Sequence, residues 1–235
     1  MLTLRRSEDR GHFDFGWLDT RHTFSFGEYF DSAHHQFRSL RVINEDVVAP
    51  GTGFGTHGHK DMEILTWVLE GALEHQDSIS LSGTKGLIKP GEAQVMSAGS
   101  GIRHSEFNAS KTEPVHLLQI WMLPEAKDLP PRYDQVAFDD ARFRNTWGLI
   151  ASREGADGSV VVFQDLRIFV ARLDAGSQLS RDLNPSRYGW LHVAKGAVIA
   201  NGQSLKAGDA AALEGETKLD LKAEVGSEVL FFDLE

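Results

Sequence analysis

The amino-acid sequence predicts an all-β fold made of two tandem barrels, on two observations. The first is a series of short apolar stretches that are rich in Val, Ile, Phe and Trp and are interrupted by Gly, Pro, Asn and Asp. Residues of these types favour strands, and their close spacing is typical of a barrel or a sandwich. The stretches cover residues 40–44, 63–69, 93–96, 117–122, 160–163, 168–173, 191–194 and 229–234.

The second observation is a weak internal repeat, which divides the chain into two halves. Residues 66–71 (TWVLEG) are similar to residues 191–196 (LHVAKG), and residues 89–96 (KPGEAQVM) are similar to residues 206–213 (KAGDAAAL). In each half an apolar strand ends in Gly, and a turn that contains Gly leads into another strand. A chain of 235 residues is long enough for two small domains of this kind.

A segment that contains two prolines separates the halves. Residues 124–144 include Pro130 and Pro131 among several acidic residues, so they are typical of a linker and are the most favourable place for short helices. We therefore expect the boundary within residues 124–148. The prediction is an N-terminal barrel over residues 1–130 and a C-terminal barrel over residues 131–235.

Charge and cysteine content exclude several classes of protein. The formal net charge of −10 at pH 7 argues against direct binding to nucleic acid. Because the chain has no cysteine, a metal site in it must use His, carboxylate and other oxygen ligands. No apolar run is long enough to span a bilayer, and the charged N-terminal residues lack the apolar core of a signal peptide. We therefore expect a cytoplasmic protein with no membrane partner.

Two pairs of residues have the spacing of metal ligands. His57 and His59 lie in a Gly-rich segment, and His104 and Glu106 lie in another. Side chains at positions i and i+2 of a strand point the same way, so each pair can face one barrel interior. Two such strands would form a site of three imidazoles and one carboxylate.

Single histidines carry less weight than these pairs, because a lone His more often forms an ordinary hydrogen bond than binds a metal. Glu63 stays an alternative carboxylate ligand, since its strand parity matches that of His57 and His59. We expect ordinary hydrogen-bonding roles for the other histidines, which are His12, His22, His34, His35, His75, His116 and His192.

Both Gly-rich segments resemble the two sequence motifs of cupins. The pattern G-x5-H-x-H-x3-E is present as Gly51, His57, His59 and Glu63. The second motif is present as Gly91, Gly99, His104 and Asn108, with Ser97 in place of the usual Pro and two extra residues before His104.

These departures, the sequence HSE at residues 104–106 and the opening residues 16–26 (GWLDTRHTFSF) resemble the pirin family over almost the whole chain. The resemblance implies two tandem cupin barrels, each a double-stranded β-helix or jelly roll, with metal in the N-terminal barrel alone. It also implies that Glu106 is a ligand and that Glu63 is a supporting carboxylate. The implied metal ligands are His57, His59, His104 and Glu106.

The repeat supports a metal-free C-terminal barrel. Aligning Gly71 with Gly196 places Asp182 and Asn184 at the positions of the paired histidines. Aligning the turns that contain Gly91 and Gly208 places Leu221 and Ala223 at the positions of His104 and Glu106. These four residues do not form a comparable set of ligands.

Three imidazoles and one carboxylate suit Fe(II) best, and also suit Mn, Co, Ni, Cu or Zn. Four protein ligands leave two positions, enough for a substrate oxygen and dioxygen. Glu106 is then the candidate catalytic base. The pirin resemblance implies a quercetin 2,3-dioxygenase that opens a flavonol ring and releases carbon monoxide, so the expected partners are a small aromatic substrate and dioxygen.

The main alternative is a non-catalytic, redox-responsive binding protein with a regulatory protein partner, as the resemblance also allows. A cupin isomerase and a purely structural metal site are further alternatives. For the aromatic residues at 24–30 we expect packing in the core rather than a substrate surface.

Overall fold

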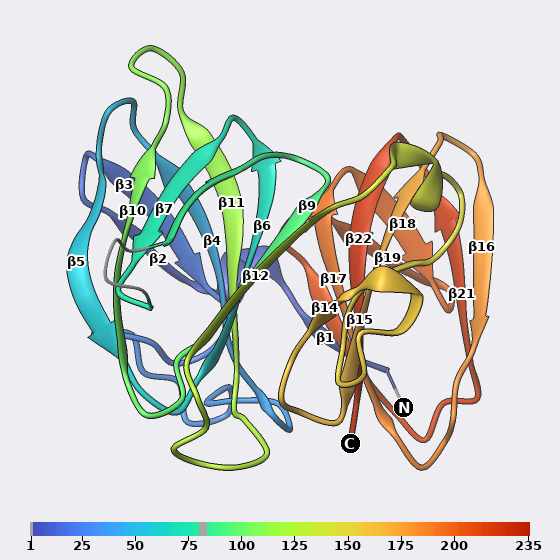
Figure 1. Cartoon of the computed structure of the whole chain (residues 1–235). Helices are drawn as coiled ribbons and strands as arrows, with labels where there is room; N and C mark the ends of the chain where they lie inside the picture. The colour runs from blue at the N-terminus through green and yellow to red at the C-terminus, as the bar shows by residue number, and fades with distance from the viewer. Residues whose placement is uncertain (1, 80–83) are drawn as a thin grey trace. The chain divides into compact units, whose positions relative to one another are not determined.

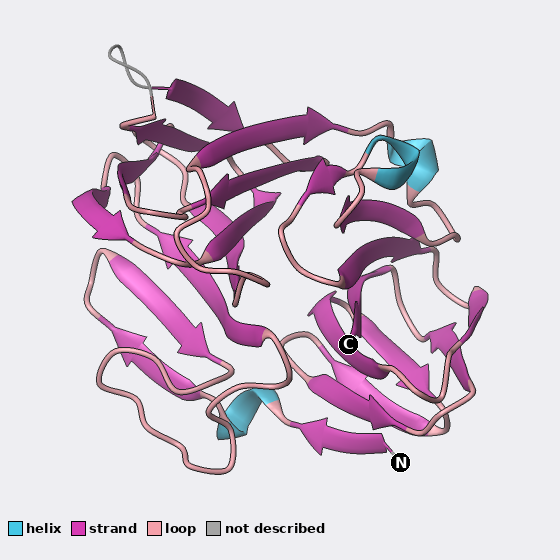
Figure 2. Cartoon of the chain, turned by 60° about the horizontal axis from the view of Figure 1, so that its bottom comes forward, coloured by secondary structure: helices cyan, strands magenta, loops and turns pink. Residues whose placement is uncertain are grey.

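The computed structural model describes residues 2–79 and 84–235, and strands and loops account for nearly all of this chain (Figure 1, Figure 2). Within these residues the helical elements are three 3-10 turns: η1 (Ser7–Asp9), η2 (Asp140–Arg142) and η3 (Ala156–Gly158). None of the helices in this described part is long and apolar enough to cross a membrane.

The chain forms two compact units. The N-terminal unit comprises residues 11–138 and 153–164, and the C-terminal unit comprises residues 2–10, 139–152 and 165–235. The domain boundary expected from the sequence, between residues 130 and 131, remains a proposal about where the repeated halves meet. The units differ from that division because each completes its sheet with a strand that lies far away in the sequence.

Two antiparallel sheets make up the N-terminal unit. The larger has the order β12-β9-β6-β11-β4-β3-β2, and the smaller has the order β5-β10-β7-β8. The strands are β2 (Gly11–Asp14), β3 (Leu18–His22), β4 (Leu40–Val48), β5 (Gly53–His59), β6 (Glu63–Glu70), β7 (Leu73–Asp77), β8 (Thr84–Ile88), β9 (Glu92–Ser97), β10 (Ile102–Asn108), β11 (Val115–Met122) and β12 (Arg132–Ala137). The short strand β14 (Val160–Val161) lies in the second segment of this unit.

The C-terminal unit repeats this arrangement. One sheet has the order β1-β20-β17-β22-β15-β13, and the other has the order β16-β21-β18-β19. The strands are β1 (Leu2–Arg5), β13 (Gly148–Ser152), β15 (Leu166–Leu173), β16 (Gln178–Asp182), β17 (Tyr188–Lys195), β18 (Ala197–Ala200), β19 (Gln203–Lys206), β20 (Ala210–Glu214), β21 (Lys218–Ala223) and β22 (Ser227–Leu234).

The two strand orders match over six strands of the larger sheets, from β12 to β3 and from β1 to β13, and over all four strands of the smaller sheets. This match confirms the predicted all-β fold of two tandem cupin barrels. β6 and β17 carry the first pair of repeated segments, and β9 and β20 carry the second pair. Each of these pairs holds the same place in its sheet. β1 pairs with β20 just as β12 pairs with β9, so the blue N-terminal strand of Figure 1 belongs with orange and red strands. Both added strands cover an edge that would otherwise expose unpaired backbone groups.

Each of the eight apolar stretches overlaps a strand, whereas the expectation of short helices in residues 124–144 is met by one 3-10 turn alone. This segment contains β12, whose residues pair with β9 from Arg132↔Ser97 to Ala137↔Glu92, and only the single turn η2. The reason is non-local, because an available sheet edge stabilises an extended chain that local composition does not favour.

The inward face of the N-terminal barrel is apolar at both ends and polar in the middle. Along β6, Ile64 and Val68 belong to two separate buried apolar clusters, and Thr66 lies between them on the same face. Along β11, Gln119 likewise lies between Leu117 and Trp121. Alternation along a strand therefore places a buried polar layer between two apolar layers, and the candidate site lies in that polar layer.

Candidate metal centre

Three of the four expected ligands converge in the N-terminal barrel. β5 carries His57 and His59, and its neighbour β10 carries His104, which lies directly opposite His57. The Nε2 atom of His104 lies 2.9 Å from Nε2 of His59 and 3.0 Å from Nε2 of His57. One ligand atom from each of the three residues lies within 4.8 Å of the others.

The hydrogen bond of His57 determines which of its two nitrogens is unprotonated in the neutral ring. Nδ1 of His57 lies 2.8 Å from the carbonyl oxygen of Gly55, so Nδ1 is the donor. A neutral ring then has a lone pair on Nε2. Because the single Nε2 site of His104 cannot form good hydrogen bonds with both neighbouring rings at once, this arrangement of nitrogens fits a shared cation better than a hydrogen-bonded cluster.

Burial keeps the imidazoles of His59 and His104 in the neutral form that binds metals. Loss of hydration, assisted by the charge of His57, lowers the pKa of His59 to about 4. The same two causes and the neighbouring histidines lower the pKa of His104 to about 2. The donor set and its protonation state therefore fit a divalent transition metal.

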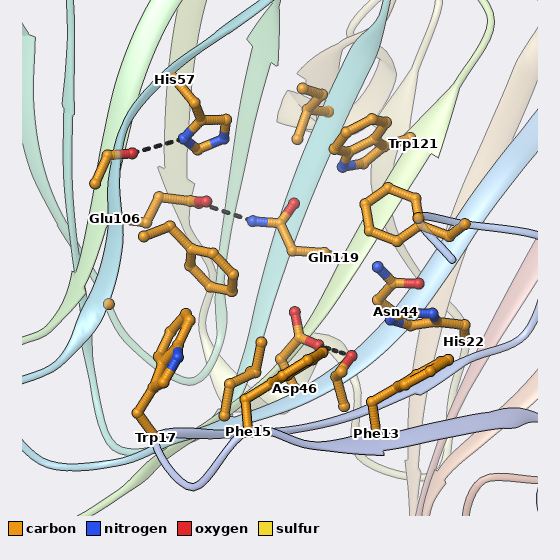
Figure 3. A pocket seen from close by; sticks show the side chains of 18 of the residues that line it. Phe13, Phe15, Trp17, His22, Asn44, Asp46, His57, Glu106, Gln119 and Trp121 are labelled. Atoms are coloured by element: carbon orange, nitrogen blue, oxygen red, sulfur yellow. Dashed lines mark hydrogen bonds between the residues drawn. The ribbon is translucent and has the colours of Figure 1, made fainter. Parts of the chain in front are cut away.

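Glu106 faces the same interior but does not join the cluster of three histidines. Its side chain is buried, and its Oε1 accepts a hydrogen bond of 2.8 Å from Nε2 of Gln119 (Figure 3). Burial raises the pKa of Glu106 to about 7, and the nearby charge of Asp46 acts in the same direction. A bulge between His104 and Glu106, where the register on β5 shifts from His57 to Phe54, sets the position of this carboxylate.

Glu63 points away from the histidines. Its Oε2 accepts hydrogen bonds from Oγ of Ser97 at 2.8 Å and from the backbone N–H of Phe163 at 3.2 Å. The residue is 1% exposed and does not line the cavity beside the histidines. Glu63 thus ties residues 153–164 to the barrel, which favours a structural role for it.

The sequence analysis missed His75 on β7. This residue was expected to have an ordinary role, yet its Nε2 lies 3.1 Å from Nδ1 of His104. A signal was available, because β7 alternates buried and exposed residues and places His75 and Asp77 on the buried face after Leu73. Two polar residues at core positions of one strand indicate a polar network in the interior.

A cavity of about 610 Å³ opens beside the three histidines, and Figure 3 shows its aromatic walls. Phe26 packs edge-on against Trp121, and Trp17 packs edge-on against Phe54, with ring centres 5.3 and 5.1 Å apart. The expectation of core packing for the aromatic residues at 24–30 holds for Phe24, whereas Phe26 lines the cavity. Beyond these residues and the candidate ligands, the aromatic and polar residues of the wall are Phe13, Phe15, Thr20, His22, Glu28, Asn44, Asp46 and Gln119.

The strand register shows which residues of the C-terminal barrel are equivalent to the candidate ligands, and it corrects the assignment made by aligning glycines. His75 lies four residues after Gly71 and pairs with Glu106, and Ala200 lies four residues after Gly196 and pairs with Leu221. Leu221 therefore matches Glu106, and the register then matches Leu219 with His104 and Arg181 with His57. On the same count, Leu183 matches His59. The alignment by glycines was off by one residue on β16 and by two on β21, because it could not include the extra residue of the bulge in β5 or differences in loop length.

Comparisons with known proteins agree with this arrangement. Residues 3–122 match the family model described as Pirin, and residues 149–234 match the model described as Quercetinase C-terminal cupin domain. The chain is 47% identical to a protein of Escherichia coli strain K12 named quercetin 2,3-dioxygenase, over 100% of this chain and 99% of that protein.

Solved structures give the same picture. The crystal structure of the bacterial pirin YhhW from Escherichia coli in complex with nickel(II) has a TM-score of 0.93 and 46% identity, covering 100% of this chain and 99% of that chain. The structure of the protein YhaK from Escherichia coli has a TM-score of 0.73 and 31% identity, covering 95% and 97%.

Proposed function

This chain belongs to the pirin family of metal-dependent dioxygenases, and we propose that it holds one divalent transition metal in the N-terminal barrel, with Fe(II) preferred over Mn, Co, Ni, Cu and Zn. The observation that carries the proposal is the convergence of the three Nε2 atoms at 2.9 and 3.0 Å. The fourth ligand is the buried carboxylate on the same strand as His104. The proposed ligands are His57, His59, His104 and Glu106.

The cavity supports a planar aromatic substrate with several hydroxyl groups. Its volume of about 610 Å³ lies in the range of small-molecule sites, and six Phe and Trp side chains line its walls. Oδ1 of Asn44 and Oε1 of Gln119 are buried and have no hydrogen-bond partner among the described residues. Two such acceptors are suited to substrate hydroxyl groups, so we propose a flavonol such as quercetin or a similar enolic or phenolic compound.

Glu106 is the proposed catalytic residue. A carboxylate whose pKa burial raises to about 7 can take the proton of an enolic hydroxyl near neutral pH. Gln119 donates to Oε1 of Glu106 and thereby orients the carboxylate. A metal held by His57, His59, His104 and Glu106 would supply the Lewis acidity that polarises the substrate oxygen. The aromatic walls exclude water from the oxygen-sensitive substrate anion.

Oxygen uptake tests this function. Protein loaded separately with Fe, Mn, Co, Ni or Cu is mixed with quercetin under air, and carbon monoxide is trapped as the product. We expect uptake with at least one metal, and loss of both bound metal and uptake in the His57→Ala and His104→Ala variants. His116→Ala is the control, because His116 pairs with Glu45 at 3.1 Å outside the cavity. Absence of uptake with every metal would rule out quercetin as the substrate.

From the sequence we also propose a cytoplasmic location. A regulatory protein partner belongs to the alternative function. The rival function, a redox-responsive binding protein, predicts metal binding without oxygen uptake. The same assay therefore distinguishes the two functions, provided that the bound metal is measured in each sample.

A further inference from the structure

We propose that His75 is a positioning residue that accepts a hydrogen bond from Nδ1–H of His104 and so keeps Nε2 of His104 directed at the metal. The two nitrogens lie 3.1 Å apart, and His75 is 2% exposed. The inference rests on the proposed function, because it requires a metal bound to His104. Metal-binding histidines usually donate their other ring N–H to a fixed acceptor, which holds the ring in place.

The position of His75 in the sheet suits this role. β10 lies between β5 and β7, so His104 has the other two histidine ligands on one side and His75 on the other. His75 pairs with Glu106 across the strands, and Asp77 pairs with His104. The support for His104 therefore comes from the neighbouring strand of the same small sheet, where backbone hydrogen bonds limit its movement.

Asp77 determines which nitrogen of His75 carries the proton. Its Oδ2 lies 3.9 Å from Nδ1 of His75, and both residues are buried. Oδ1 of Asp77 accepts a hydrogen bond of 2.9 Å from the backbone N–H of Ile79, which holds the carboxylate in position. A negative charge on this side favours the proton on Nδ1 of His75 and leaves the lone pair on Nε2, facing His104.

Tyr133 holds the plane of the His75 ring. The two ring centres lie 5.1 Å apart, with an angle of 31° between the planes. The cross-strand partner of His75 on β8 is Gly86, and a Cβ atom there would lie 2.2 Å from the hydroxyl oxygen of Tyr133. The absence of a side chain at Gly86 thus permits the close approach of Tyr133.

The C-terminal barrel supplies an internal comparison. Ala200 occupies the position of His75, and Leu219 occupies the position of His104. The C-terminal barrel thus lacks both the histidine that corresponds to His104 and the acceptor that corresponds to His75. Simple packing of the barrel interior therefore does not require a histidine at this position.

Metal affinity of matched variants tests the proposal. His75→Phe keeps a planar ring but removes the acceptor, and we expect Zn²⁺ affinity, measured by competition with a chelator, to fall about 10- to 100-fold. His75→Gln retains a side-chain acceptor and should recover most of this loss, and Asp77→Asn should have a smaller effect than His75→Phe. His116→Phe is the control in the same barrel and should bind Zn²⁺ as the wild type does. Wild-type affinity in folded His75→Phe protein would overturn the proposal.

A second measurement requires no variant. In Zn²⁺-loaded protein labelled with ¹⁵N-histidine, we expect one slowly exchanging ring N–H, assigned to His104, with a scalar coupling across its hydrogen bond to Nε2 of His75. A His104 N–H that exchanges rapidly and lacks this coupling would contradict the role of His75. Failure of the wild type to bind Zn²⁺ through His104 would instead contradict the proposed function, so the two failures are distinguishable.

Discussion

The two barrels have the same strand order but place opposite kinds of side chain at equivalent positions. The N-terminal barrel has His57, His104 and Glu106 facing inward, whereas the C-terminal barrel has Arg181, Leu219 and Leu221. Both leucines are buried, with 0% and 3% exposure. The cupin fold thus supplies the positions, and a few inward residues decide whether an interior can hold a metal.

Arg181 makes the contrast sharper. Its guanidinium carbon lies 3.6 Å from the ring centre of Phe169, a cation–π contact inside the C-terminal barrel. Burial lowers the pKa of Arg181, although an arginine remains charged at neutral pH. A permanent cation therefore occupies the position that corresponds to His57, a proposed metal ligand, in the other barrel.

The largest effect is expected from matched substitutions at His57 and Arg181, which hold equivalent positions in the two barrels. His57→Ala should remove bound metal and turnover, because it deletes one of the three nitrogens of the cluster. Arg181→Ala should leave metal content and turnover unchanged and lower the free energy of unfolding by about 1–3 kcal/mol through lost packing and cation–π contact. Metal analysis, oxygen uptake and urea unfolding of both variants are the measurements. A loss of metal in Arg181→Ala would break the comparison.

The next effect separates the two carboxylates of the N-terminal barrel. Glu106→Gln should slow turnover about 10²- to 10⁴-fold, or weaken metal binding, because the base is lost while its shape is kept. Glu63→Gln should retain metal and turnover, since Glu63 accepts from Ser97 and Phe163 instead. Steady-state kinetics and metal analysis of both variants show which carboxylate the reaction and the metal require. Loss of metal and turnover in Glu63→Gln, with both retained in Glu106→Gln, would show that the assignment of the two carboxylates is reversed.

A moderate effect is expected at the cavity wall. Phe26→Ala removes a ring that packs against Trp121, and we expect KM for quercetin to rise about 10-fold through lost apolar contact, with metal content unchanged. Phe24→Ala is the comparison, because Phe24 is 2% exposed and does not line the cavity. That variant should lower thermal stability without a selective change in KM.

The smallest effect concerns the metal-free protein. Burial raises the pKa of Glu106 to about 7, so the folded state binds its proton more tightly than the unfolded state does. The resulting stabilisation is complete below the unfolded pKa of 4.5 and is lost as pH rises through about 7. In EDTA, Glu106→Gln should therefore be more stable than the wild type at pH 8, by about 1–3 kcal/mol, and similar to it at pH 4.5. Equal stability at pH 8 would contradict the buried charge.

Local patterns predicted the strands well, because apolar and β-branched stretches such as residues 117–122 are strand-like wherever they occur in a sheet. The i and i+2 spacing also brought His57, His59 and His104 together correctly. Sequence alone could not predict β12 or the role of His75, since both depend on which strand lies beside them. The bulge in β5 had the same consequence for the alignment of the C-terminal barrel, because its extra residue shifts the equivalent positions next to it on the strand.

Anomalous diffraction from crystals of Zn²⁺-loaded protein tests the central claim most directly. We expect one strong peak per chain, with the three Nε2 atoms of His57, His59 and His104 and a carboxylate oxygen of Glu106 at about 2.0–2.2 Å from it. The C-terminal barrel should have no peak near Arg181 and Leu219. A peak bound by Glu63 with Glu106 turned away, or a second peak inside the C-terminal barrel, would contradict the account.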